Sequence, residues 1–236
     1  MRPLTTIAFD ADDTLWHNER FFQDSQMRFA ELLDAFADAE KVEQALIAAE
    51  RRNIGFYGFG VKGFTLSMLE TATTLAGDDL PASAVREILS LGKTMLEHPV
   101  EILPGVIDAL EQLKDTYALM VITKGDLFDQ ERKLIQSGLA DHFAHVEIVS
   151  DKTPDTYRRI FDRHGQGTAR SAMIGNSLKS DILPALEAGS WAVHVPHDLT
   201  WALEHAEEPA DHPRYRRADT VGSVPTLLEG IVAGRG

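Results

Sequence analysis

The chain opens with a short apolar run, from Leu4 to Leu15, in which three carboxylates interrupt the apolar residues. Such a run is typical of a buried parallel strand, although its length alone leaves a buried helical segment open. Carboxylates crowded at the end of a buried segment repel one another and lose hydration, so a protein keeps them where a cation or a reaction uses them. Because ligands of open α/β sheets bind at the carboxyl ends of strands, the run predicts an acidic site at a sheet edge.

The spacing of Asp10 and Asp12 adds a geometric expectation. Residues two apart in an extended strand point to the same face, so both carboxylates would address one group of atoms if the extended geometry persists past the strand. One acid would then attack while the other transfers a proton. The alternative is a solvated acidic loop or the first turn of a helix, where Asp is common as a cap. The apolar residues on both sides favour the buried interpretation.

Composition limits the class of partner. The 236 residues carry a formal net charge of −14, which disfavours nucleic acid and anionic membranes because both are bound by clustered Lys and Arg. A small phosphorylated ligand held by a few local cations remains compatible with that charge. The chain has no cysteine, no signal-like opening segment and no apolar run of bilayer length. We therefore expect a cytoplasmic globular protein; its oligomeric state stays open.

An all-helical insertion is expected over residues 17–99. Apolar residues recur there at intervals of three and four with acidic residues between them, which is the period of amphipathic helices. Pro81 stands where the first turn of a helix tolerates proline. The apolar positions that carry this period are Met27, Phe29, Leu32, Leu33, Phe36, Val42, Leu46, Phe64, Met68, Leu69, Ala72, Leu75, Val85, Ile88, Leu89 and Met95.

Alternating helices and strands are expected in the rest of the chain, which would form one discontinuous domain from residues 1–16 and 100–236. A helix follows Pro104 and Gly105, and another, from about Asp126, ends at Gly138. Repeated alternation of this kind predicts a doubly wound parallel sheet with helices on both faces. Besides the opening run, the expected buried strands are residues 118–122, 146–149, 171–174 and 191–195.

Polar residues follow four of the five expected strands. Parallel strands bring their carboxyl ends to one edge, so these side chains should converge. Thr and backbone N–H groups at a helix start hold phosphate oxygens, Lys neutralises charge, and carboxylates bind Mg²⁺. The set therefore indicates phosphoryl chemistry. Its members are Asp10, Asp12, Thr123, Lys124, Lys152, Asn176 and Asp181.

The same series resembles the four motifs of the haloacid dehalogenase-like (HAD) superfamily of hydrolases. The motifs are Asp10-Ala11-Asp12-Asp13-Thr14, Ile122-Thr123-Lys124-Gly125, Lys152, and Gly175-Asn176-Ser177-Leu178-Lys179-Ser180-Asp181. The helical insertion is similar to that superfamily's C1-type cap, and Leu103-Pro104-Gly105-Val106 to the segment by which the chain re-enters the core. The resemblance extends to about Val195 and implies a Rossmann-like core with an inserted cap.

The resemblance implies a two-step hydrolysis of a phosphate monoester. Asp10 would be the nucleophile that becomes an aspartyl phosphate. Asp12 would protonate the leaving oxygen and then deprotonate the attacking water. Thr123 and Lys152 would hold the transferring group, and Lys124 would contribute to substrate binding.

Mg²⁺ is the cofactor that the resemblance implies. It would lie against Asp10, the backbone carbonyl of Asp12 and an oxygen from the fourth motif. Many relatives carry Asp at the position of Asn176, and an amide oxygen is a weaker ligand for Mg²⁺ than a carboxylate. Whether Asn176 or Asp181 provides the ligand stays open at this stage.

Asp12 also bears on the subclass. Relatives that cleave carbon–halogen bonds usually lack an acid two residues after the nucleophile, since a halide leaving group needs no proton. A phosphonate hydrolase would need a cap lysine able to form an imine; Lys41, Lys62 and Lys93 are available, but nothing in the sequence marks one of them. A phosphatase acting on a small phosphorylated metabolite is therefore favoured over a dehalogenase or a phosphonatase. A signalling module of the receiver kind and a catalytically silent phosphate-binding relative are the rivals from other classes.

Two further motifs invite functional interpretations. Residues 58–63 match the dinucleotide fingerprint G-x-G-x-x-G, but no strand precedes them, so we interpret them as a connection within the cap and the first guess for substrate contact. His194 and His197, with His205 and His212 nearby, suggest a transition-metal site. Their spacing matches no usual helical ligand pair and Pro196 interrupts it, so surface or packing histidines are the preferred interpretation.

Overall fold

The computed structural model describes residues 4–234, which divide into two compact units. Of the described residues, the core unit contains 4–17, 100–124 and 130–234, and the helical unit contains Asn18–Pro99 and Gly125–Asp129. The division differs from the boundaries expected from the sequence at two places. His17 joins the core because its backbone N–H donates to Glu101 O at 3.0 Å. The 125–129 segment joins the helical unit, where Asp126 pairs with Lys62 at 2.9 Å.

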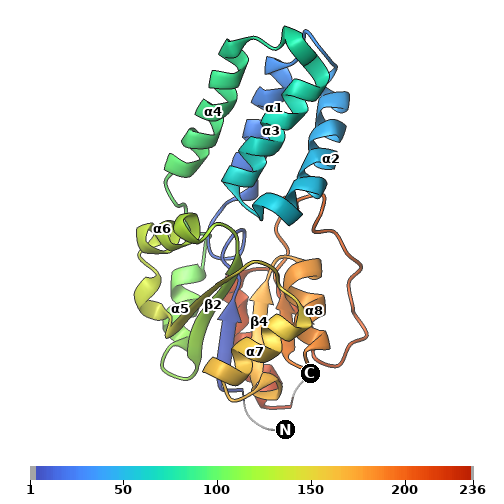
Figure 1. Cartoon of the computed structure of the whole chain (residues 1–236). Helices are drawn as coiled ribbons and strands as arrows, with labels where there is room; N and C mark the ends of the chain where they lie inside the picture. Colours follow the sequence, from blue (N-terminus) through green and yellow to red (C-terminus); the bar gives the residue numbers. More distant parts are fainter. Residues whose placement is uncertain (1–3, 235–236) are drawn as a thin grey trace. The chain divides into compact units, whose positions relative to one another are not determined.

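Six parallel strands form the sheet of the core unit, in the order β3-β2-β1-β4-β5-β6. In Figure 1 the blue strand β1 lies between β2 and β4. The doubly wound parallel fold predicted from the sequence is thus confirmed. The short strand β6 was not predicted, because it contains one apolar residue and two arginines. The strands are β1 (Thr6–Phe9), β2 (Ala118–Lys124), β3 (His145–Val149), β4 (Ser171–Gly175), β5 (Trp191–His194) and β6 (Tyr215–Arg217).

Alternate residues of the strands enter two different apolar clusters. Ile7 and Phe9 pack with α5, α6 and α9, whereas Ala8 between them packs with α7 and α8. This alternation is the period of two that extended strands impose, and it means that both faces of the sheet are covered. The helices are α5 (Val106–Leu113), α6 (Leu127–Ser137), α7 (Pro154–His164), α8 (Leu183–Glu187) and α9 (Val224–Val232).

Single-turn elements and glycines set the boundaries of several helices. Gly105, with a φ of 80°, precedes α5, and Gly138, with a φ of 69°, follows α6, as the sequence predicted for both helices. The turn that precedes α8 is a π-helical turn, a form that is frequent at functional sites. The single-turn elements are η1 (Gly77–Asp79), η2 (Ala140–His142), η3 (Thr168–Arg170), η4 (Leu178–Ile182) and η5 (Val221–Ser223).

The helical unit has four helices around its own apolar core. Phe29, Met68 and Ile88 are fully buried in this core, in agreement with the apolar period of the sequence. Met27 and Leu89 fit the same period but are 61% and 44% exposed. The helices are α1 (Glu19–Leu32), α2 (Ala39–Tyr57), α3 (Val61–Ala76) and α4 (Ala82–Glu97). Among the described residues, no helix is long and apolar enough to cross a membrane.

Candidate active site

The loop after β1 carries the first two acids. β1 ends at Phe9, and the backbone N–H of Asp10 donates to Ile174 O of the neighbouring strand at 2.8 Å. The chain then turns tightly, because Leu15 N–H donates back to Ala11 O at 2.8 Å and Asp13 has a φ of 59°. The extended geometry therefore does not persist past β1, and the side chains of Asp10 and Asp12 bind different partners.

Asp10 is buried next to one ammonium group. Its Oδ1 accepts a short hydrogen bond from Lys152 Nζ, and its Oδ2 lies 3.4 Å from Thr14 Oγ1. Burial and the nearby charge of Asp181 raise the pKa of Asp10 to about 7, although Lys152 acts in the opposite direction. The carboxylate that the sequence marks as the nucleophile therefore depends on nearby cations for its ionised form.

Asp12 has three donors. Lys133 Nζ donates to its carboxylate at 2.6 Å, and Gln130 Nε2 and Trp16 Nε1 each donate at 2.8 Å. Burial raises the pKa of Asp12, but the charge of Lys133 and these hydrogen bonds outweigh it, so the net pKa is lowered. In this conformation Asp12 is an ionised carboxylate, the form that accepts a proton.

Lys152 links Asp10 to the fourth motif. Its Nζ also donates to Asp181 Oδ1 at 2.6 Å, and burial, which would lower its pKa, is outweighed by the two carboxylates, which raise it. Asp181 Oδ2 accepts from Ser177 N–H at 2.9 Å. A Cβ on Gly175 would lie 2.3 Å from that same Asp181 Oδ2, so the glycine of the Gly-Asn-Ser turn gives Asp181 its space.

The position expected for Mg²⁺ is surrounded by oxygen atoms. The terminal atom of the Asn176 amide lies 3.2 Å from both the backbone carbonyl oxygen of Asp12 and Thr14 Oγ1, and 3.3 Å from Asp10 Oδ2. When this atom is the amide nitrogen, it donates to these three oxygen atoms. When the amide is rotated, its oxygen takes the same place and, with Asp10 Oδ2 and the Asp12 carbonyl oxygen, offers three hard oxygen ligands. That donor set fits Mg²⁺. Asp181 instead directs its oxygens to Lys152 and Ser177, which favours Asn176 over Asp181 as the direct ligand.

The charge balance of the site also fits a divalent cation. The site contains three carboxylates and two ammonium groups. Lys152 forms ion pairs with Asp10 and Asp181, and Lys133 forms one with Asp12. An incoming phosphate dianion would add two negative charges to a group of side chains that already has an excess of one negative charge. A divalent cation would cancel that addition, which is the electrostatic role that metals have in phosphoryl sites.

The second motif, residues 122–125, has fewer contacts with the acids of the site than its sequence indicates. Thr123 is buried at the end of β2, and its hydroxyl makes a weak 3.5 Å contact with Lys124 O; no described hydrogen bond joins it to Asp10. Lys124 Nζ donates to Glu204 Oε1 at 2.5 Å and to Ser180 Oγ at 2.7 Å. The ammonium that was expected to contact substrate is therefore bound to an internal carboxylate.

Glu204 comes from the segment after β5. Besides Lys124, its carboxylate accepts hydrogen bonds from the hydroxyls of Ser177 and Ser180. Burial raises its pKa, but Lys124 and these hydrogen bonds lower it overall. Glu204 thus joins the segment after β5 to the second and fourth motifs.

The loop that the sequence nominated for substrate contact lies in the helical unit. Phe56 and Tyr57, at the end of α2, are 83% and 52% exposed and are not core residues. Lys62, one of the lysines considered for imine chemistry, forms an ion pair with Asp126 and lies 5.9 Å from the ring centroid of Phe128. This ion pair occupies the ammonium of Lys62.

Sequence reasoning missed the contact of Thr14 with Asp10 and all three donors to Asp12. Thr14 stood inside the first motif but was given no role. Gln130 and Lys133 lie three residues apart on α6, so they share one helix face, and this spacing was the available signal. Trp16, four residues after Asp12, was treated only as the last residue of the first core segment.

The site and fold together define a parallel α/β hydrolase with a buried aspartate at the end of its first strand. The family profile for haloacid dehalogenase-like hydrolases matches residues 4–189, and the chain belongs to that family.

Among its relatives, a glyceraldehyde 3-phosphate phosphatase from Methanothermobacter thermautotrophicus is 36% identical over 115 residues. That match covers 44% of this chain and 50% of the relative, so the chain spans about half the length of that curated protein.

Solved structures extend the comparison to the whole chain. The crystal structure of a haloacid dehalogenase-like family hydrolase from Xanthomonas campestris is 38% identical, with a TM-score of 0.88 over 99% of this chain and 94% of that one. An L-2-haloacid dehalogenase from Xanthobacter autotrophicus has a TM-score of 0.67 over 97% of this chain and 99% of that one, at 14% identity. The second likeness shows the fold alone.

Proposed function

We propose that this hydrolase is a Mg²⁺-dependent phosphatase that acts on a phosphate monoester of a small metabolite through an aspartyl phosphate on Asp10. The observation that carries the proposal is the difference between the two acids of the first motif. Asp10 lies against Lys152 and Asn176, whereas Asp12 is an ionised base held by Lys133. Similarity to a phosphatase over part of the chain supports the same conclusion.

In the first step, a carboxylate oxygen of Asp10 attacks the phosphorus and the bond to the ester oxygen breaks. Lys152 opposes the rise in the pKa of Asp10 that burial causes, and it neutralises charge on the transferring group. The departing alkoxide takes a proton from the Asp12–Lys133 pair, in which the Lys133 ammonium donates a 2.6 Å hydrogen bond to the carboxylate. The product alcohol then leaves.

In the second step, water attacks the phosphorus of the aspartyl phosphate. Its proton passes to Asp12, the bond to Asp10 breaks, and inorganic phosphate is released with the Asp10 carboxylate restored. Mg²⁺, held by Asp10, the Asp12 carbonyl and Asn176, would screen the repulsion between phosphate and carboxylate. Thr123 and Lys124 complete the proposed substrate contacts, the latter once Glu204 is displaced.

A dehalogenase is the alternative to be tested in the same experiment. A halide leaves without a proton, so a proton donor at Asp12 would have no role in the first step of that reaction. We would measure phosphate release from an aryl phosphate, and halide release from a 2-haloacid, with Mg²⁺ and with EDTA. We expect phosphate release that needs the metal and disappears in Asp10→Asn. Halide release without phosphate release would overturn the proposal.

A further inference from the structure

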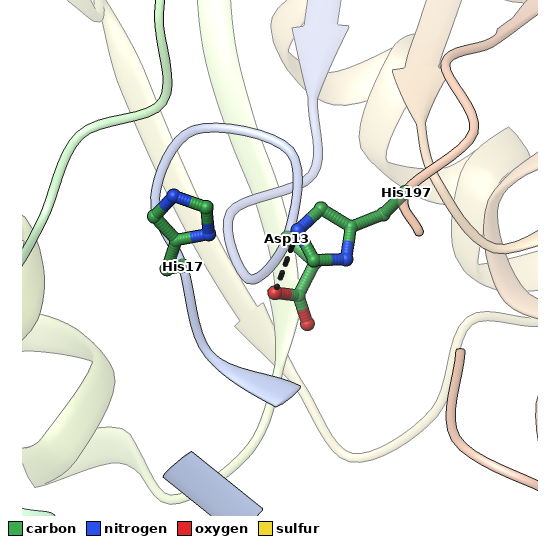
Figure 2. Close-up of side chains that lie close together, drawn as sticks. All are labelled: Asp13, His17 and His197. Carbon is green, nitrogen blue, oxygen red and sulfur yellow. Dashed lines mark ion pairs between the residues drawn. The ribbon is translucent and has the colours of Figure 1, made fainter. Parts of the chain in front are cut away.

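A second group of ligand-type side chains lies beside the catalytic loop. It consists of Asp13, His17 and His197, whose ligand atoms all lie within 4.8 Å of one another (Figure 2). Asp13 and His17 come from the loop after β1, and His197 comes from the segment after β5. The sequence considered His197 only with its neighbours His194, His205 and His212, whereas the fold gives it partners from the start of the chain.

The spacing within the group fits two ligands of one cation better than a hydrogen bond. His197 Nε2 lies 3.7 Å from Asp13 Oδ1, the contact drawn in Figure 2. That separation is longer than an N–H···O hydrogen bond. Nitrogen and oxygen ligands at about 2.1 Å from a tetrahedral ion are about 3.4 Å apart, so a small inward movement would bring Asp13 and His197 to that separation.

The orientation of His197 is set by the backbone. Its Nδ1 lies 3.0 Å from Leu199 O and also accepts a hydrogen bond from Leu199 N–H at 3.2 Å, so the backbone accommodates either tautomer of the ring. When Nδ1–H donates to that carbonyl, Nε2 carries the lone pair, and Nε2 is the atom that points toward Asp13. Metal-binding histidines commonly have this arrangement, in which the second ring nitrogen donates to a backbone carbonyl. The ring of His17 completes the group, with its centroid 5.7 Å from that of His197.

We propose that Asp13, His17 and His197 bind a divalent transition-metal ion such as Zn²⁺, at a position separate from that expected for Mg²⁺. Two imidazoles and one carboxylate suit Zn²⁺ and similar borderline ions, whereas Mg²⁺ prefers oxygen ligands alone. The side chains of Asp13 and His197 are only 8% and 12% exposed, so the ligands are partly shielded from bulk water. The ion would fasten the segment after β5 to the loop that carries Asp10 and Asp12.

The test is a calorimetric titration of chelator-treated full-length protein with Zn²⁺, with Mg²⁺ present in excess to occupy oxygen sites. We expect one Zn²⁺ per chain, and binding at least about tenfold weaker in His17→Ala and in His197→Ala. Asp13→Asn should also weaken it, because Asn tolerates the positive φ but carries no charge. His205→Ala, at an exposed histidine of the same segment as His197, is the matched control and should bind as the wild type does.

Two further measurements make the result independent of how the variants fold and of the phosphatase proposal. X-ray absorption of the Zn²⁺-loaded wild type should show two imidazole ligands, and the wild-type melting temperature should rise with Zn²⁺. No Zn²⁺ binding, binding unchanged in both histidine variants, or an absorption spectrum without imidazole would overturn the proposal. None of these readouts uses activity, so the site can fail while phosphate hydrolysis is observed, and the reverse.

Discussion

Asp10 and Asp12 are separated by one residue, yet their surroundings act on them in opposite directions. Burial and the charge of Asp181 raise the pKa of Asp10 to about 7, whereas Lys133 and two neutral donors lower the pKa of Asp12. Pairs of acids whose surroundings separate their pKa values are typical of sites that divide nucleophilic and proton-transfer roles. The tight turn at Asp13 produces this difference, because it directs the two carboxylates to different partners.

The largest expected effect comes from removing the base. Asp12→Asn keeps the shape of the side chain but cannot accept a proton, so turnover of an aryl phosphate should fall by about 10²- to 10⁴-fold. The second step should suffer more than the first, because an aryl leaving group needs little protonation. Rapid-quench kinetics should therefore show a burst of phenol followed by slow turnover. Steady turnover at the wild-type rate would contradict the assigned role of Asp12.

The next effect is on stability. Lys152→Met leaves Asp10 and Asp181 buried without their shared counter-ion, and the free energy of unfolding should fall by about 3–5 kcal/mol. Urea unfolding monitored by circular dichroism measures the loss. Lys93→Met, at an exposed position of α4, is the control and should change the free energy by less than about 0.5 kcal/mol. An equally small change at Lys152 would mean that the pair of carboxylates does not depend on this ammonium.

A smaller effect should follow from reducing the difference between the pKa values of Asp10 and Asp12. Lys133→Gln removes the charge that lowers the pKa of Asp12, so that pKa should rise and Asp12 should be protonated at a higher pH. The midpoint of the Asp12 carboxyl-carbon titration, followed by NMR, should then move upward by about one pH unit. Lys133→Arg retains the charge and should leave that midpoint near its original position. A downward movement in Lys133→Gln would contradict the account.

The smallest effect concerns Glu204, whose pKa is lowered from 4.5. A carboxylate whose pKa is lower in the folded than in the unfolded protein stabilises the fold at a pH above its unfolded-state pKa. That contribution is lost as the pH falls through its folded-state pKa. The free energy of unfolding of Glu204→Gln should therefore be about 1–2 kcal/mol lower than that of the wild type at neutral pH. In strong acid the two proteins should have the same free energy of unfolding. The exposed Glu207→Gln is the matched control. A difference that grows toward acid pH would have the wrong sign.

The sequence predicted the parts of the site that depend on the sheet. Asp10, Lys152 and Asp181 each follow a parallel strand or its turn, and register alone brings such positions to one edge. It did not predict Lys133 or Glu204, whose positions depend on how α6 and an irregular segment pack against the sheet. The sequence predicted that Asp10 and Asp12 point to the same side, on the assumption that the chain stays extended past β1. Asp13 instead has a left-handed conformation, so the two side chains point to different partners.

Peptide mapping after an acid quench tests the central claim most directly. Asp12→Asn would be mixed with an aryl phosphate and Mg²⁺, quenched in acid during the slow phase, digested and analysed by mass spectrometry. We expect one phosphoryl group per chain, located on Asp10, and none in Asp10→Asn or after treatment of the wild type with EDTA. A phosphoryl group on another residue, or turnover without phosphorylated protein, would contradict the assignment of Asp10 as the nucleophile.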